Sequence, residues 1–139
     1  MIQGTENREQ RTGNEKRAVR NVIRSHKDLT VWKKGFSLAL DVYRLTSTFP
    51  PEELYGLTSQ MRRAAFSIPA NIAEGSRRRG NDYARFLRTS AGSASELETY
   101  LLGAQELGFG DPQFIQYCLE STDEVLRMLH VLGERVRVQ

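Results

Sequence analysis

The sequence predicts an all-α fold, an antiparallel up-down four-helix bundle. Apolar side chains recur at steps of three and four residues in four long segments, which is the period of one helix face. No segment shows the alternation of a half-buried strand, and the connections between segments are short. Short connections place successive helices antiparallel. The expected helices cover about residues 30–48, 54–80, 82–107 and 112–136.

The first expected helix carries more apolar surface than a contact with two neighbouring helices needs. Asp28 offers an N-cap side chain before it, and Pro50 and Pro51 end it. The main apolar stripe consists of Trp32, Phe36, Leu40 and Tyr43, and it is widened by Leu38, Val42, Leu45 and Phe49. This width indicates self-association, unless one bundle absorbs the whole face.

The second expected helix combines an apolar face with a basic back. The apolar face consists of Leu54, Leu57, Met61, Ala64, Ala65, Ile68 and Ile72. Pro69 lies inside this pattern and lacks an N–H, so we expect the helix to kink there. Glu52 and Glu53 precede the helix, where acidic side chains suit its dipole. Gly75 interrupts the stripe where a side chain would otherwise project.

The third and fourth expected helices have clear end signals. Asn81 or Asp82 is expected to cap the third helix, and Gly108 is a natural residue to end it. Asp111 followed by Pro112 predicts the start of the fourth helix. Small residues fill positions 90–95, and glycine at positions 92 and 103 costs helix stability, so a tight helix–helix contact is predicted there.

Length and composition indicate one folded domain with an N-terminal extension. The chain has 139 residues, of which 39% are hydrophobic and 27% charged. Residues 1–27 are basic and polar, so we predict a flexible, largely disordered extension, followed by a bundle domain over residues 28–139. Neither a secretory signal nor a membrane-spanning apolar run is apparent, and we expect a cytoplasmic protein without membrane contact.

Residues with catalytic or metal-binding potential are sparse, and we expect no enzyme, cofactor or metal. His26 and His130 are far apart, and Cys118 is the single cysteine, expected to be a buried small hydrophobe. There is neither a nucleophile motif nor a phosphate-binding loop with its lysine. Asn71 is expected to satisfy the backbone left unpaired by Pro69, and Glu74 to pair with an arginine, unless the two bind a ligand.

An arginine-rich segment is the best functional candidate. Residues 62–88 carry a net charge of +5, whereas residues 89–139 carry −5. Arginine pairs with phosphates through a planar, permanently charged fork. The candidate nucleic-acid-binding residues are Arg62, Arg63, Arg77, Arg78, Arg79, Arg85 and Arg88.

An alternative leaves these arginines solvated or paired with acidic residues of the last two helices. The possible acidic partners are Glu96, Glu98, Glu120, Asp123 and Glu124. Arg62 and Arg63 are the members most expected to be structural, because they lie among core positions. Tyr83 and Phe86 neighbour Arg85 and are candidates for stacking on bases, although both also lie on the expected core stripe.

Several strings together resemble a known family. They are DLTVWKKG (28–35), YGLTSQMRRAAFSIPANIAEGSRRR (55–79), FLRTSAGS (86–93), ELE (96–98) and the Leu-Gly pair at 107–108. With them the sequence resembles the small four-helix-bundle proteins encoded in intervening sequences of bacterial 23S ribosomal RNA genes. Residues 1–27 fall outside this resemblance.

The resemblance implies the bundle fold and a homo-oligomer, typically a pentamer. It also implies kinship with the accessory protein of diversity-generating retroelements, a basic barrel that binds nucleic acid and a reverse transcriptase. Two hypotheses follow. The protein is an oligomer that binds RNA or DNA phosphates through its arginines, or it is a scaffold that recruits a protein partner such as a reverse transcriptase without touching nucleic acid.

Overall fold

The computed structural model describes residue 26 and residues 29–137 of the chain. The predicted extension over residues 1–27 is therefore outside the described residues, apart from His26, as is the expected cap Asp28. The elements are α2 (Thr30–Thr46), a short 3₁₀ turn η2 (Pro51–Glu53), a π turn η3 (Leu54–Thr58), α3 (Ser59–Gly75), α4 (Gly80–Leu107) and α5 (Pro112–Arg137). The described residues form helices and turns without a strand, so the all-α prediction is confirmed.

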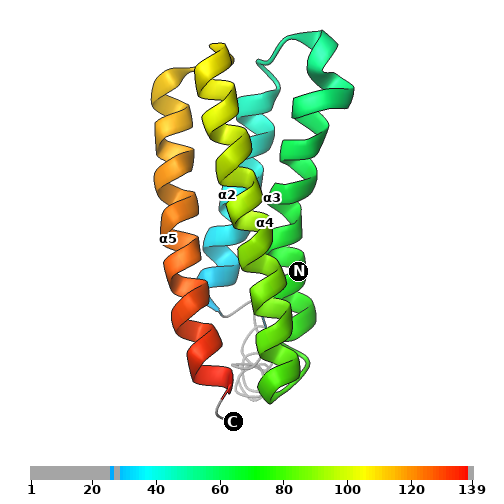
Figure 1. Cartoon of the computed structure of the whole chain (residues 1–139), viewed down its shortest axis with the longest axis vertical. Helices are drawn as coiled ribbons and strands as arrows, with labels where there is room; N and C mark the ends of the chain where they lie inside the picture. The colour runs from blue at the N-terminus through cyan, green and yellow to red at the C-terminus, as the bar shows by residue number, and fades with distance from the viewer. Residues whose placement is uncertain (1–25, 27–28, 138–139) are drawn as a thin grey trace, which may run out of the picture.

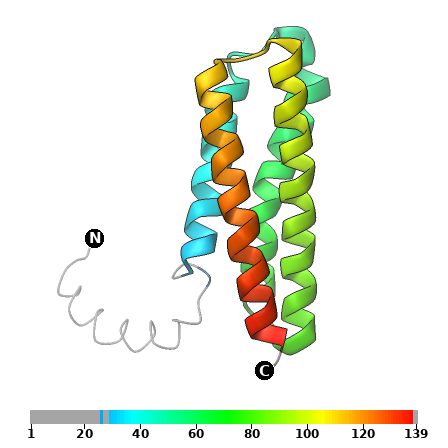
Figure 2. The same ribbon diagram turned by 60° about the vertical axis from the view of Figure 1, so that its left-hand side comes forward.

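The four long helices pack side by side around one core (Figures 1 and 2). Each helix contacts its neighbours in the chain, and α2 also packs on α5, which closes the ring. Consecutive helices run in opposite directions (Figure 1). Lys34 near the start of α2 pairs with Glu124 at the middle of α5 at 3.2 Å. The predicted four-helix bundle is thus confirmed.

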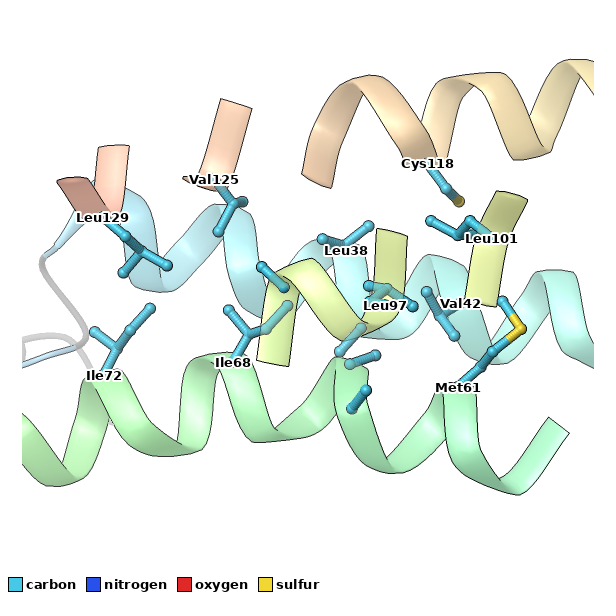
Figure 3. Packing of buried hydrophobic residues seen from close by; sticks show 14 of the residues in the cluster. Leu38, Val42, Met61, Ile68, Ile72, Leu97, Leu101, Cys118, Val125 and Leu129 are labelled. Atoms are coloured by element: carbon cyan, nitrogen blue, oxygen red, sulfur yellow. The ribbon is translucent and has the colours of Figure 1, made fainter. Parts of the chain in front are cut away.

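The core is a continuous cluster to which all four helices contribute. Figure 3 shows its side chains converging between the helices. The labelled members are Leu38, Val42, Met61, Ile68, Ile72, Leu97, Leu101, Cys118, Val125 and Leu129, all of them buried. The predicted burial of Cys118 is confirmed, and burial raises the pKa of its thiol to about 12.

Helix α2 turns to the core the side of its apolar face that was expected to be the edge, and not the expected main stripe. Leu38, Val42 and Leu45 are buried, although the pattern made them only the edge of the apolar face. Phe36 and Tyr43, expected at its centre, are 39% and 45% exposed. Gly35 explains this rotation, because it brings α2 close to α3: a Cβ there would lie 3.1 Å from the Ile68 side chain.

Helix α3 begins at Ser59 and not near residue 54. Gly56 has φ −113° and ψ −114°, values outside the helical region, which separate the preceding π turn from the regular helix. Leu54, expected in the core, is therefore exposed. The Glu53 carboxylate accepts a hydrogen bond from the Leu57 N–H at 3.2 Å. Pro69 is buried inside the helix, which continues to Gly75, and the kink expected there stays a prediction.

The ends of α4 and the start of α5 test three cap predictions. Helix α4 begins at Gly80 with Arg79 in the N-cap position, so the expected cap at position 81 or 82 is wrong. Gly108 ends α4 at φ 76°, in the left-handed region, as predicted. Asp111 Oδ1 accepts a hydrogen bond from the Gln113 N–H at 3.3 Å, so the predicted cap of α5 is confirmed.

The small residues of α4 are used inside the bundle. Ser90 donates a hydrogen bond to the Ile68 carbonyl at 2.9 Å, and Ser93 donates to the Ser67 hydroxyl at 2.8 Å. These bonds join α4 closely to α3. However, a Cβ at Gly92 or Gly103 would meet no atom within 4 Å, so no close contact with another helix of this chain offsets these two glycines.

Candidate nucleic-acid interface

The seven candidate arginines lie in two separate places. Arg62 and Arg63 are in the first turns of α3, beside the end of α2. The other five surround the turn between α3 and α4, at the opposite end of α3 (Figure 1). About 15 residues of helix at 1.5 Å per residue separate the two groups by roughly 20 Å. The seven residues therefore do not form one patch.

Arg62 and Arg63 are held by contacts within the bundle. Arg62 donates a hydrogen bond from Nε to Thr46 Oγ1 at 2.8 Å, and its guanidinium carbon lies 4.1 Å from the centre of the Tyr43 ring. Arg63 donates to Gln60 at 2.5 Å and lies 3.7 Å from the Glu96 carboxylate. These contacts favour the structural interpretation of both residues.

Arg78 and Arg85 form a small charge network at the α3–α4 turn. Arg78 pairs with Glu74 at 2.6 Å and with Asp82 at 3.3 Å, and Arg85 pairs with Asp82 at 2.8 Å. The hydrogen bond from Arg78 holds the pKa of Glu74 below its usual value, and the hydrogen bond from Arg85 does the same for Asp82. The expected pairing of Glu74 with an arginine is confirmed.

Phe86 packs against both arginines of this network and is not a free platform for a base. The guanidinium carbons of Arg78 and Arg85 lie 5.0 Å and 4.6 Å from the centre of its ring. Tyr83 is half-buried, and burial raises the pKa of its hydroxyl. A Cβ at Gly75 would lie 2.7 Å from Phe86 Cβ, which shows how closely α3 and α4 approach here.

Asn71 bonds to backbone, although not to the carbonyl that the proline frees. Its Nδ2 donates to the Ser67 carbonyl at 2.9 Å and to the Ser67 hydroxyl at 3.0 Å. Pro69 deprives the carbonyl four residues earlier, that of Ala65, of its donor. The expectation that Asn71 satisfies the backbone group left unpaired by Pro69 is therefore wrong, and its side chain bonds to Ser67 instead.

The remaining three arginines, Arg77, Arg79 and Arg88, are exposed. None of them forms an ion pair or a side-chain hydrogen bond with another residue that the structure describes. Arg77 lies close enough to Glu74 for its charge to help lower the pKa of that carboxyl, but the donors of all three arginines are available to an external anion. Of the five acidic residues of the last two helices that were expected to pair with the seven candidate arginines, only Glu96 does so among the described residues, and its partner is Arg63.

Charge is segregated along the long axis of the bundle. One half contains the α3–α4 turn and consists of residues 29–38, 67–94 and 124–137, with ten Lys/Arg and four Asp/Glu. The other half consists of residues 39–66 and 95–123, with three Lys/Arg and nine Asp/Glu. We call these halves the basic end and the acidic end. Their formal charges are +6 and −6.

A row of aromatic side chains, the aromatic strip, runs along the outer side of α2 and α3, with two members exposed and two, Trp32 and Phe66, partly buried. It consists of Trp32, Phe36, Tyr43 and Phe66. Trp32 stacks on Phe36 with ring centres 5.1 Å apart, and Phe66 lies edge-on to Phe36 at 6.2 Å and to Tyr43 at 5.5 Å. The sequence pattern assigned the α2 members to the core. Only the close contact at Gly35, which no residue spacing reveals, shows that they face outward.

Metal and membrane sites are not apparent in the described part of the chain. No group of three His, Cys, Asp or Glu side chains among the described residues is placed to hold a metal ion. None of the helices in this part is long and apolar enough to cross a membrane.

The fold and the site define a small all-helical protein, a four-helix bundle with one strongly basic end. The sequence profile of the 23S rRNA-intervening sequence protein family matches residues 27–131, and the chain belongs to this family. No curated protein matches the sequence.

A crystal structure gives independent support for the fold. It is of a protein of unknown function from the S23 ribosomal protein family of Bacteroides thetaiotaomicron. The match has a TM-score of 0.67 and 18% identity, and it covers 75% of this chain and 98% of the other.

Proposed function

We propose that this protein is a non-enzymatic, cytoplasmic homo-oligomer that binds the phosphate backbone of RNA or DNA through its basic end. The observation that carries the proposal is the segregation of +6 and −6 along the bundle, with Arg77, Arg79 and Arg88 at the positive end and outside the ion pairs of the described residues. A surface of one sign attracts a polyanion and orients it before contact. Arginine then pairs with individual phosphates.

Charges from three separate parts of the chain support this assignment. Lys33 in α2 and Arg135 in α5 are exposed at the same end as the arginines of the α3–α4 turn. Helix α2 also begins at this end, so the sequence of residues 1–27, with its net charge of +4, joins the bundle there. The acidic end would repel the same polyanion. Binding should therefore be one-sided.

The aromatic strip supports self-association. Side chains such as Phe36 and Tyr43 are the type enriched in the centres of protein interfaces, and their exposure in one bundle leaves apolar area to bury. The family resemblance implies a pentamer. A closed ring of parallel bundles would place every basic end on the same rim, which multiplies the phosphate contacts available to one nucleic acid strand.

Fluorescence anisotropy of labelled single-stranded RNA and duplex DNA across a salt series tests the binding proposal. The variant Arg77→Gln/Arg79→Gln removes two exposed charges at the basic end. The matched control Arg44→Gln/Arg63→Gln removes two exposed charges at the acidic end. If both basic-end residues contact single-strand phosphates, the log–log salt slope should fall by about 1.4, since each contact contributes about 0.7. Equal losses in the two variants would contradict a site at the basic end.

Light scattering after size exclusion tests the assembly. We expect the native protein to be oligomeric and Phe36→Lys/Tyr43→Lys to be monomeric with an intact helical spectrum. Tyr117→Lys, at an exposed tyrosine of α5 that is 54% accessible, is the control and should leave the assembly unchanged. A monomeric native protein would refute the oligomer.

A protein scaffold is the second candidate function, and the aromatic strip is the observation that favours it. In this case the strip would receive a protein partner, such as a reverse transcriptase, and the arginines would serve only solubility or assembly. The anisotropy series separates the two. No RNA or DNA binding at the lowest salt concentration, from a correctly assembled protein, would replace the nucleic-acid proposal with the scaffold.

A further inference from the structure

A cavity between α4 and α5 lies within the basic end. Its volume is about 410 Å³, which is within the range of small-ligand sites. Its floor is apolar and consists of Ala84 and Leu87 from α4 together with Leu129 from α5, all of them buried. Of the three arginines that carry the proposed backbone contacts, Arg88 lines this cavity and Arg77 and Arg79 do not.

The cavity exists because the two helices face each other there with small residues. Gly133 lines it from α5 and Ala91 from α4. A Cβ at Gly133 would meet no atom within 4 Å, so the space at this position is open. A glycine inside a long helix destabilises it relative to alanine, and here no close helix contact compensates that cost.

Cationic and donor groups surround the opening. Arg88 lines it and forms no ion pair with any other described residue. His130 lines it from α5 and offers ring nitrogens. Arg137 also lines it and pairs with Glu134 at 3.0 Å, an exposed contact between residues three apart on one helix. Such exposed pairs contribute little to stability, so Arg137 can exchange its partner for a stronger anion.

We propose that this cavity binds the phosphate monoester of a nucleotide, with the phosphate at Arg88, His130 and Arg137 and the sugar against the apolar floor. A terminal phosphate carries a charge closer to −2 than to −1 and has three strong acceptor oxygens, unlike the diester phosphates inside a strand. Two arginines match that chemistry. The inference rests on the proposed function and deepens it: the protein recognises a phosphorylated strand end as well as the backbone.

The test compares three forms of one internally labelled short RNA, with a 5′-phosphate, a 3′-phosphate or hydroxyl groups at both ends. We expect one phosphorylated form to bind at least about fivefold more tightly than the hydroxyl form, because a charge-assisted, bidentate contact is gained. The variant Gly133→Leu should fill the cavity and abolish this preference. Gly92→Leu is the matched control, since Gly92 is also a helical glycine with open space, outside the cavity. It should retain the preference.

Arg88→Gln provides a second variant that leaves the packing unchanged, and it should also remove the preference. Equal affinity for all three RNAs, or a preference that survives in Gly133→Leu and Arg88→Gln, would overturn the inference while leaving backbone binding intact. Adenosine monophosphate as a competitor separates the two sources of the ligand. If adenosine monophosphate displaces the phosphorylated RNA and adenosine does not, the cavity also binds free nucleotides. If adenosine monophosphate does not displace it, the cavity is assigned to strand ends alone.

The cavity also has a readout that does not depend on RNA binding. Adenosine monophosphate should raise the melting temperature of the native protein more than adenosine does, and Gly133→Leu should lack this difference. If no RNA binds at the lowest salt, the proposed function fails. If adenosine monophosphate still raises the melting temperature in that case, the cavity assignment stands. If RNA binds but shows no preference for a phosphorylated end, and the melting temperature does not rise, the cavity assignment is wrong.

Discussion

Replacing Gly75 by alanine tests how closely the arginine-bearing turn is seated on α4. A Cβ at this position would lie 2.7 Å from Phe86 Cβ and 3.1 Å from a ring carbon of Tyr83. Phe86 Cβ is bonded directly to the backbone, so it cannot rotate away, and α3 and α4 must separate locally. Overpacking of this kind costs about 1–3 kcal/mol. Helix propensity alone would favour alanine by up to about 1 kcal/mol.

The matched comparison is Gly92→Ala, where the added methyl group meets open space. We expect Gly92→Ala to raise the free energy of unfolding by about 1 kcal/mol and Gly75→Ala to be less stable than it by about 1–3 kcal/mol. Urea unfolding followed by far-ultraviolet circular dichroism, at several protein concentrations, measures both values. If Gly75→Ala were as stable as Gly92→Ala, the close approach of the two helices would be refuted.

Three further predictions concern other parts of the molecule. Because the native state keeps the Cys118 thiol protonated up to about pH 12 and the unfolded chain releases this proton near the ordinary value of 9.0, the free energy of unfolding should fall as pH rises between these values. Alkaline urea titrations should show that Cys118→Ala loses this decrease; an unchanged slope would contradict the burial. Arg62→Gln should lower the free energy of unfolding by about 1 kcal/mol through loss of its bond to Thr46, whereas Arg77→Gln should change it by less than about 0.5 kcal/mol. The same denaturation assay would show that Gly108→Ala costs about 1–2 kcal/mol because φ is 76° there, and a neutral effect would argue against the left-handed cap.

Local signals in the sequence sufficed wherever the physical cause is itself local. The helix faces follow from apolar spacing, and the start of α5 follows from an acid followed by a proline, whose geometry depends on a few neighbouring residues. Gly108 is a further example, since only glycine enters the left-handed region without strain. The start of α3 was missed because the non-helical Gly56 lies inside an apolar pattern that continues through it.

The sequence by itself determined the fold class, the inward face of α3 and the identity of the basic residues. Only the tertiary structure decided which basic residues form ion pairs, because ion pairing depends on neighbours in space: Arg78 pairs with Glu74 and Asp82, whereas Arg77 and Arg79 pair with no described residue. It also decided where charge accumulates. Antiparallel packing brings the start of α2, the end of α3, the start of α4 and the end of α5 together, so charges that cancel along the chain separate into a basic and an acidic end.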